Sequence, residues 1–180
     1  MSDRAETVTA SRYVHRGKVV NLRIDDVRLP DGRKAVREVV EHAAAVCVVA
    51  LDADDNVLLV RQFRLPTNKA LLEIPAGSVN QGEDPADAAA RELAEECGYV
   101  PGRIERLAGF YSAPGFLTEY LHLYLATDLR EERRDADDDE DVDVVRIPAD
   151  EAIARAARGD FEDAKTLVGL LALGARRRAG

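Results

Sequence analysis

The sequence predicts a mixed α/β or α+β domain in which helices pack against a β-sheet. Two observations lead to this prediction. Short segments with the apolar patterns of strands are interspersed with three segments of helical periodicity. One strand segment, residues 44–51, is a continuous apolar run, as expected for a strand that is buried on both faces of a sheet. The 180 residues are enough for one domain with a substantial core.

The remaining strands are predicted from alternation and from turn signals. Residues 7–15 alternate loosely, and residues 19–29 alternate more regularly up to Pro30-Asp31-Gly32, a strong turn signal. Residues 34–41 return as the partner strand, so residues 19–41 are predicted to form a hairpin. Further strands are expected at residues 57–63, 71–75, 103–111, 120–126 and 142–147.

The first helix is predicted to run from Pro85 to Cys97. Asp84 suits the N-cap, Pro85 suits the first helical position, and Gly98 suits the left-handed residue just past the end. Two further helices are expected at residues 148–158 and 163–176, and the second of them is organised around several leucines.

The first helix carries three glutamates, Glu92, Glu95 and Glu96, within an arc of about 100°. This arc lies on the side of the helix away from an apolar stripe formed by Ala86, Ala90, Leu93 and Cys97. Glu92 and Glu96 are like charges at i,i+4, which costs roughly 0.2–0.5 kcal/mol. All three lie in the last two turns, where the helix dipole disfavours anions. A solvated acidic face is one interpretation. A bound divalent cation is the other, and it also accounts for the adjacent glycine loop (Gly77, Gly82), because hard cations take oxygen ligands and convert repulsion into coordination.

Composition restricts the partners and the location. The net charge is −9, of which residues 131–143 contribute −7 through nine acidic residues and two arginines. This acidity argues against nucleic-acid binding, and residues 131–141 are expected to form a solvated loop. No apolar run is long enough to cross a membrane and the N-terminus lacks a signal-like apolar region, so a cytoplasmic protein is expected. Cys47 and Cys97 lie in apolar patterns and are predicted to be reduced core residues.

The stretch from Gly77 to Tyr99 resembles the Nudix box, in which a glycine and a glutamate precede an Arg-Glu-aliphatic-x-Glu-Glu-x-Gly-aliphatic segment. Eight residues match at the spacing of the box: Gly77, Glu83, Arg91, Glu92, Leu93, Glu95, Glu96 and Gly98. The one departure is Tyr99, where an aliphatic residue is usual. The resemblance extends from about Gly17 to Leu173 and implies a Nudix fold, a mixed β-sheet sandwiched between helices, preceded by an N-terminal antiparallel strand region.

The resemblance also implies a metal site and a reaction. Mg²⁺, or Mn²⁺, would be bound by Glu92, Glu95, Glu96 and the backbone carbonyl of Ala76, so Glu95 and Glu96 are candidate catalytic residues as well. A metal bridging a pyrophosphate neutralises its charge, orients it and can activate water. Glu83 and Arg91 are expected to form an ion pair that holds the loop against the helix.

Features outside the box resemble the ADP-ribose pyrophosphatase branch of the Nudix superfamily. Pro114 follows Gly98 by sixteen residues, a distance that marks this branch, and Pro114 and Gly115 are assigned to the substrate site. Glu119 follows in the same loop, where family members carry a glutamate implicated as general base. For an isolated loop glutamate, a solvated surface role is the alternative.

Two arginine-containing strands resemble family segments that line the substrate site. Arg37 and Arg64 are candidates to contact phosphate, because a planar guanidinium can bind phosphate through two hydrogen bonds. Glu38 is expected to meet the adenine edge. The alternative for both arginines is an exposed cation in a surface ion pair. His42 and His15 have no partner visible in the sequence and are interpreted as structural.

The resemblance divides the chain into an N-terminal strand region, residues 1–42, and a Nudix hydrolase domain, residues 43–180. It implies a homodimer in which the N-terminal strands help to build the partner's adenine site. The sequence alone indicates only that about 40 residues precede the first buried strand and could be exchanged.

The predicted function is Mg²⁺-dependent hydrolysis of ADP-ribose to AMP and ribose 5-phosphate. Three alternatives remain at this point. The first is a pyrophosphatase for another nucleoside diphosphate sugar, such as GDP-mannose or UDP-glucose. The second is a nucleotide-sensing Nudix module without turnover. The third is an acidic interaction protein that works through residues 131–143.

Overall fold

The computed structural model describes residues 4–132 and 143–179, and it divides the chain into two compact units. The N-terminal unit comprises the chain up to residue 44 together with residues 111–120. The core unit comprises residues 45–110 and the chain from residue 121 onward. Residues 111–120 thus pack with the N-terminal strands, although most of the core strands separate the two segments along the chain. No feature of the sequence indicated this association.

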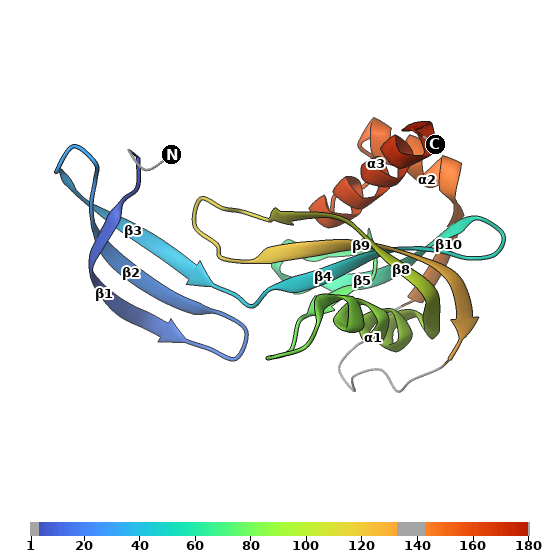
Figure 1. Ribbon diagram of the computed structural model, residues 1–180, viewed down its shortest axis with the longest axis horizontal. Coiled ribbons are helices and arrows are strands. Elements are labelled where there is room, and N and C mark those ends of the chain that lie inside the picture. Colours follow the sequence, from blue (N-terminus) through green and yellow to red (C-terminus); the bar gives the residue numbers. More distant parts are fainter. Residues whose placement is uncertain (1–3, 133–142, 180) are drawn as a thin grey trace. The chain divides into compact units, whose positions relative to one another are not determined.

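The N-terminal unit is built on a three-stranded antiparallel sheet, whose three strands Figure 1 labels at the N-terminal end of the chain. The turn between the second and third strands contains Gly32, which has φ 88°, a conformation that favours glycine. The first strand has two register irregularities against the second and is exposed along its whole length. The strands are β1 (Thr7–Arg16), β2 (Asn21–Arg28) and β3 (Lys34–Glu41).

The core unit contains a seven-stranded mixed sheet in which five strands lie in the order β10-β5-β4-β9-β8. The central strand β4 pairs in parallel with β9, and it pairs antiparallel with β5 and with the short strand β7. The strand β6 lies outside this order and pairs with β5. The strands are β4 (Ala45–Leu51), β5 (Asn56–Arg64), β6 (Lys69–Glu73), β7 (Ala76–Ser78), β8 (Tyr99–Tyr111), β9 (Tyr120–Glu131) and β10 (Asp143–Pro148), and a 3₁₀ turn, η1 (Leu65–Thr67), joins β5 to β6.

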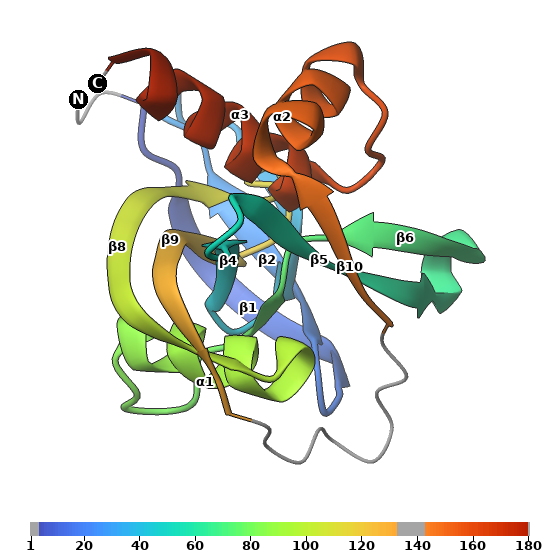
Figure 2. The ribbon, with the colours of Figure 1, turned by 90° about the vertical axis from the view of Figure 1, so that its right-hand side faces the viewer.

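Helices cover both faces of this sheet: α1 (Pro85–Cys97) lies on one face, and α2 (Ala149–Arg158) and α3 (Ala164–Ala179) lie on the other (Figures 1 and 2). The side chains of β4 alternate between the two layers. Val46 and Val48 pack with the α1 residue Leu93, whereas Cys47 and Val49 pack with Leu170 and its neighbours on the opposite side. This two-sided burial explains why β4 is apolar throughout.

The structure confirms the predicted strand and helix segments, the mixed α+β class and the core position of both cysteines, which are free and buried. The sequence did not indicate β7 or η1, and β8 begins directly at Tyr99, earlier than predicted. Most of the expected acidic loop, residues 133–142, lies outside the described residues. Among the residues that the structure does describe, no helix has the length and apolar character needed to cross a bilayer.

Candidate active site

Local sequence signals determine the bounds of α1. The Asp84 carboxylate accepts a hydrogen bond from the Ala86 N–H at 2.8 Å, and Pro85 occupies the first turn. Gly98 adopts φ 74° and donates its N–H to the Ala94 carbonyl at 3.0 Å. This N-cap, proline and left-handed glycine confirm the predicted start and end of the helix.

Arg91, on α1, connects the helix to the glycine loop through all five of its N–H groups. Its Nε and Nη2 donate to the two oxygens of Glu83 at 2.9 and 3.1 Å, which confirms the predicted ion pair. Nη2 also donates to the Ser78 carbonyl at 3.0 Å. Nη1 donates to Glu92 at 2.7 Å and to Glu95 at 2.9 Å. A lysine could not reproduce this arrangement, because it has only three donors on one nitrogen.

This arrangement strongly stabilises the charged form of Glu83. The hydrogen bonds from Arg91, together with one from the Asn80 N–H, lower the pKa of Glu83 to about 2. In turn, Glu83 is the largest cause of the raised pKa of Arg91. The loop and the helix are therefore joined by a pair that is ionised throughout the physiological range.

Two of the three predicted metal-binding glutamates lie against β7. The Glu96 side chain is buried, and its Oε2 accepts the Ala76 N–H at 3.1 Å. The Glu92 carboxylate lies so close to Gly77 that a Cβ at residue 77 would come within 2.0 Å of it. The burial of Glu96 differs from the sequence interpretation, which placed it opposite the apolar stripe of the helix. Its burial follows from the close approach of β7 to this helix.

The donor set fits a hard divalent cation in its chemistry, because it consists of carboxylates beside the backbone of the short strand β7. The side chains are not gathered around a common point, however. In the described parts of the chain, no group of three or more His, Cys, Asp or Glu side chains is arranged to hold a metal ion. The cation between Glu92 and Glu95 is instead the Arg91 guanidinium. Arg91 binds one oxygen of each carboxylate, Oε1 of Glu92 and Oε2 of Glu95.

Glu119 belongs to the N-terminal unit, where its loop is attached to the end of β3. Val40 exchanges backbone hydrogen bonds with Phe116 at 2.7 Å and Thr118 at 3.0 Å. The Thr118 hydroxyl accepts the His42 N–H at 2.9 Å and donates to the His42 carbonyl at 3.1 Å. Glu119 Oε1 then lies 3.5 Å from His42 Nδ1. The sequence did not reveal this partner for His42, because the two residues meet only when the loop packs on β3.

The other predicted substrate residues of the N-terminal unit are exposed. On β3, Arg37 contacts Glu6 at 2.5 Å and the Val36 carbonyl at 3.0 Å, while Glu38 points to solvent. Pro114 and Gly115 form the exposed tip of the loop, and a Cβ on Gly115 would meet no atom within 4 Å. These positions are accessible to a ligand, and their substrate roles stay predictions.

Arg64, at the end of β5, has a partner that the sequence did not suggest. Its Nε and Nη2 donate to the two oxygens of the buried Glu73 at 2.8 and 2.9 Å. Lys165 contacts the same carboxylate. Burial alone would raise the pKa of Glu73, but the hydrogen bonds from Arg64 and the charge of Lys165 keep it below its usual value. The hydrogen bonds to Glu73 are also the main cause of the raised pKa of Arg64, and the charge of Glu96 adds to it.

Comparisons with known protein families agree with this geometry. The family described as NUDIX domain matches residues 41–168. The chain is a member of the Nudix hydrolase family. A second family, described as nucleoside diphosphate sugar hydrolase N-terminal domain, matches residues 6–40. Together the two matches cover the N-terminal strands and the Nudix box.

Several curated relatives are similar to this Nudix hydrolase over almost its whole length. It is 38% identical to an ADP-ribose pyrophosphatase of Bacillus subtilis (92% of this chain, 91% of that protein). It is 39% identical to a methanol dehydrogenase activator of Bacillus methanolicus (91% and 89%). It is 40% identical to an ADP-ribose pyrophosphatase of Mycobacterium tuberculosis (93% and 82%).

A crystal structure of an ADP compounds hydrolase has the same fold as this chain. The two superpose with a TM-score of 0.88, covering 99% of this chain and 97% of that one, at 24% sequence identity. The predicted Nudix fold is therefore confirmed.

Proposed function

We propose that this Nudix hydrolase cleaves the pyrophosphate bond of ADP-ribose to give AMP and ribose 5-phosphate, with Mg²⁺ as its cofactor and Mn²⁺ as a substitute. The observation that carries the proposal is the similarity, over more than nine tenths of the chain, to two proteins named ADP-ribose pyrophosphatase. That similarity includes the N-terminal strands, which lie outside the NUDIX match.

The helix α1 and the strand β7 supply the residues proposed to hold the metal, namely Glu92, Glu95, Glu96 and the Ala76 carbonyl. The chemistry that Mg²⁺ supplies when bound is Lewis acidity and charge neutralisation at the pyrophosphate. The Arg91–Glu83 pair supports this proposal, because it fixes the glycine loop beside the carboxylates.

Glu119 is proposed as the general base that accepts the proton of the attacking water. Its support is the contact with His42 and the attachment of its loop to β3, which restrict the positions that the carboxylate can adopt. Arg37 and Arg64 are proposed to bind phosphate, Glu38 to contact the adenine edge, and Pro114 and Gly115 to line the substrate site.

The proposal includes a homodimer that exchanges residues 1–42 and a Nudix domain spanning residues 43–180. The exposure of the whole of β1 is consistent with a strand that pairs outside its own unit. Light scattering of the full-length protein measures the oligomeric state, and a monomer would contradict exchange. A cytoplasmic location is also proposed; the two free thiols suit a reducing compartment.

A turnover screen tests the substrate. ADP-ribose, GDP-mannose and UDP-glucose are compared at equal concentration with Mg²⁺ and with Mn²⁺, and AMP or the corresponding nucleoside monophosphate is measured. The highest kcat/KM is expected for ADP-ribose, and a preference for GDP-mannose or UDP-glucose would overturn the assignment. Calorimetry with ADP-ribose and Mg²⁺ addresses the sensing alternative, because binding without product would favour a non-catalytic module.

A further inference from the structure

We propose that the first turn of α3 positions Arg64 for a substrate phosphate, acting through Lys165 and Glu73. This inference rests on the proposed function, in which Arg64 contacts a phosphate. It assigns positioning roles to two residues that the sequence did not single out as functional.

Glu73 fixes the plane of the Arg64 guanidinium. The carboxylate is almost fully buried, and it binds the edge of the guanidinium formed by Nε and Nη2. Among the described residues, Nη1 of Arg64 has no hydrogen-bond partner. The Arg64 side chain is 39% exposed, so the edge that Glu73 leaves open is accessible to a ligand. A guanidinium edge of this kind suits a phosphate oxygen.

Lys165 holds Glu73 in this orientation. Its Nζ contacts Glu73 Oε2, the oxygen that also accepts from Arg64 Nη2, and lies 3.1 Å from Asp163 Oδ1. The Lys165 side chain is only 13% exposed, so both carboxylates are needed to compensate its burial. Removing the ammonium would leave Arg64 as the only cationic partner of Glu73 within the described parts of the chain.

Asp163 and Thr166 attach the start of α3 to the chain beside Glu73. Asp163 Oδ2 accepts the Thr166 N–H at 2.9 Å and the Thr166 hydroxyl at 2.6 Å. The same hydroxyl accepts the N–H of Ile74, the residue after Glu73, at 2.8 Å. The start of α3 is therefore hydrogen bonded to the residue that follows β6, which places Lys165 beside Glu73.

Lys165 also affects the charge that Arg64 presents to a ligand. The cluster contains two cations, Arg64 and Lys165, and two anions, Glu73 and Asp163, so it is neutral as a whole. Without Lys165, Glu73 would neutralise Arg64 alone and the cluster would become anionic. Loss of Lys165 should therefore weaken phosphate binding for two reasons. The Arg64 guanidinium would be less well oriented, and the cluster around it would carry a net negative charge.

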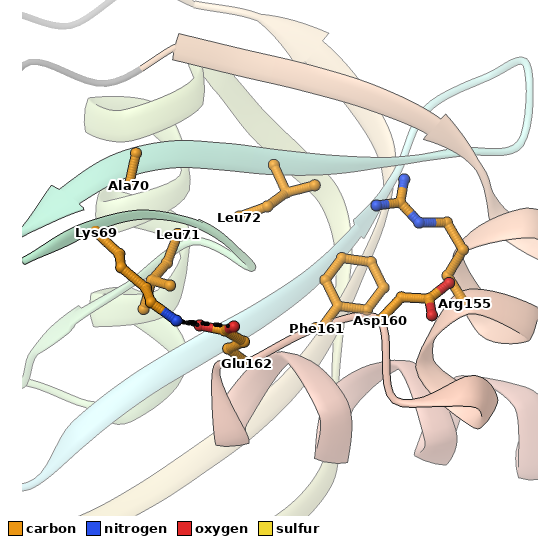
Figure 3. Close-up of a pocket in the computed structure, with 8 residues that line it drawn as sticks. All are labelled: Lys69, Ala70, Leu71, Leu72, Arg155, Asp160, Phe161 and Glu162. Atoms are coloured by element: carbon orange, nitrogen blue, oxygen red, sulfur yellow. Dashed lines mark hydrogen bonds and ion pairs between the residues drawn. The ribbon is translucent and has the colours of Figure 1, made fainter. Parts of the chain in front are cut away.

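A nearby lysine provides a matched control. Lys69 lies opposite Arg64 in the β5–β6 register, and its ammonium contacts the Glu162 carboxylate at 2.8 Å. Both residues line a cavity of about 440 Å³ between β6 and the α2–α3 connection (Figure 3). Lys69 and Glu162 are 57% and 60% exposed and do not touch Glu73. Lys69→Met removes one lysine charge, as Lys165→Met does, but from an exposed residue that does not contact Glu73.

The test is a double-mutant cycle that compares the wild type, Lys165→Met, Arg64→Gln and the double variant. Lys69→Met is the control. Titration calorimetry gives the Kd of ADP-ribose in EDTA, where no turnover occurs, and steady-state assays with Mg²⁺ give kcat and KM. Circular dichroism and thermal unfolding verify that each variant is folded. Because Lys165 acts through Arg64, the two substitutions should not be additive.

We expect Lys165→Met to raise Kd and KM by roughly three- to tenfold, the effect of weakening one ordinary hydrogen bond to the phosphate, while kcat changes much less. In the Arg64→Gln background the same substitution should have no further effect on Kd or KM. A Lys165→Met variant that behaves like Lys69→Met, or one whose effect persists without Arg64, would overturn the positioning role alone. A wild-type protein that neither binds nor hydrolyses ADP-ribose would overturn the proposed function, and the positioning role with it.

Discussion

The Nδ1 atom of His42 lies 3.5 Å from Oε1 of Glu119, and both side chains are about four-fifths buried. The pair joins the end of β3 to the loop that carries the candidate general base. Hydrogen bonds from Val40 and His42 to the loop hold the backbone on both sides of this contact.

Replacing Glu119 by glutamine should slow turnover by about 10²–10⁴, the range typical of a lost general base. The measurement is kcat at saturating ADP-ribose with Mg²⁺. His42→Gln is the companion variant and should cause a smaller loss, because His42 only orients Glu119. A two- or three-fold effect of Glu119→Gln would assign that residue a positioning role instead.

Glu96→Gln should abolish turnover while the fold is retained. Glutamine keeps a side-chain oxygen that can accept the Ala76 N–H, but it lacks the charge that a divalent cation requires. The rate with Mg²⁺ and the thermal unfolding midpoint are measured together. Asp87→Asn removes an exposed carboxylate from the first turn of the same helix and serves as the control. Near wild-type turnover by Glu96→Gln would exclude it from the metal site.

The stability contribution of Glu83 should depend on pH. Its pKa is depressed to about 2 in the folded protein, from an ordinary value of 4.5, so the pair with Arg91 stabilises the fold above pH 4.5. This contribution should disappear as the pH falls from about 5 to 2. Denaturant unfolding of wild type and Glu83→Gln at pH 6, 4 and 3 gives the difference in free energy of unfolding. That difference should shrink steadily with falling pH, and a constant difference would contradict the assignment.

Gly77→Ala should destabilise the protein by about 1–3 kcal/mol, the usual cost of overpacking. The reason is the Glu92 carboxylate, which a Cβ at residue 77 would overlap. In a Glu92→Ala background the same substitution should cost less, because the overlapping group has been removed. Denaturant unfolding of the two single variants and the double variant measures the coupling. Equal costs in both backgrounds would show that the close contact has another origin.

Much of the fold could be predicted because its signals are local. The caps of α1 at Asp84 and Gly98, the turn at Gly32 and the apolar run of β4 all depend on neighbouring residues. The Arg91–Glu83 ion pair was also predicted, from the spacing of a known motif, and the structure confirms it.

The missed features involve partners that are distant in the chain. Lys165 and Glu73 are 92 residues apart, and Thr118 and His42 are 76 residues apart. Sequence alone described Arg64 as a candidate phosphate contact but could not show that half of its guanidinium is bound by a buried carboxylate. It likewise placed Glu96 on the polar side of its helix, whereas β7 covers it.

The sequence by itself therefore determined the family, the fold class and the helix that carries Glu92, Glu95 and Glu96, since capping, periodicity and motif spacing are properties of contiguous residues. Only the tertiary structure decided which groups those residues meet: Arg91 between Glu92 and Glu95, β7 against Glu96, and α3 behind Arg64. The physical reason is that a charged side chain takes its burial and its partners from segments that chain folding brings beside it.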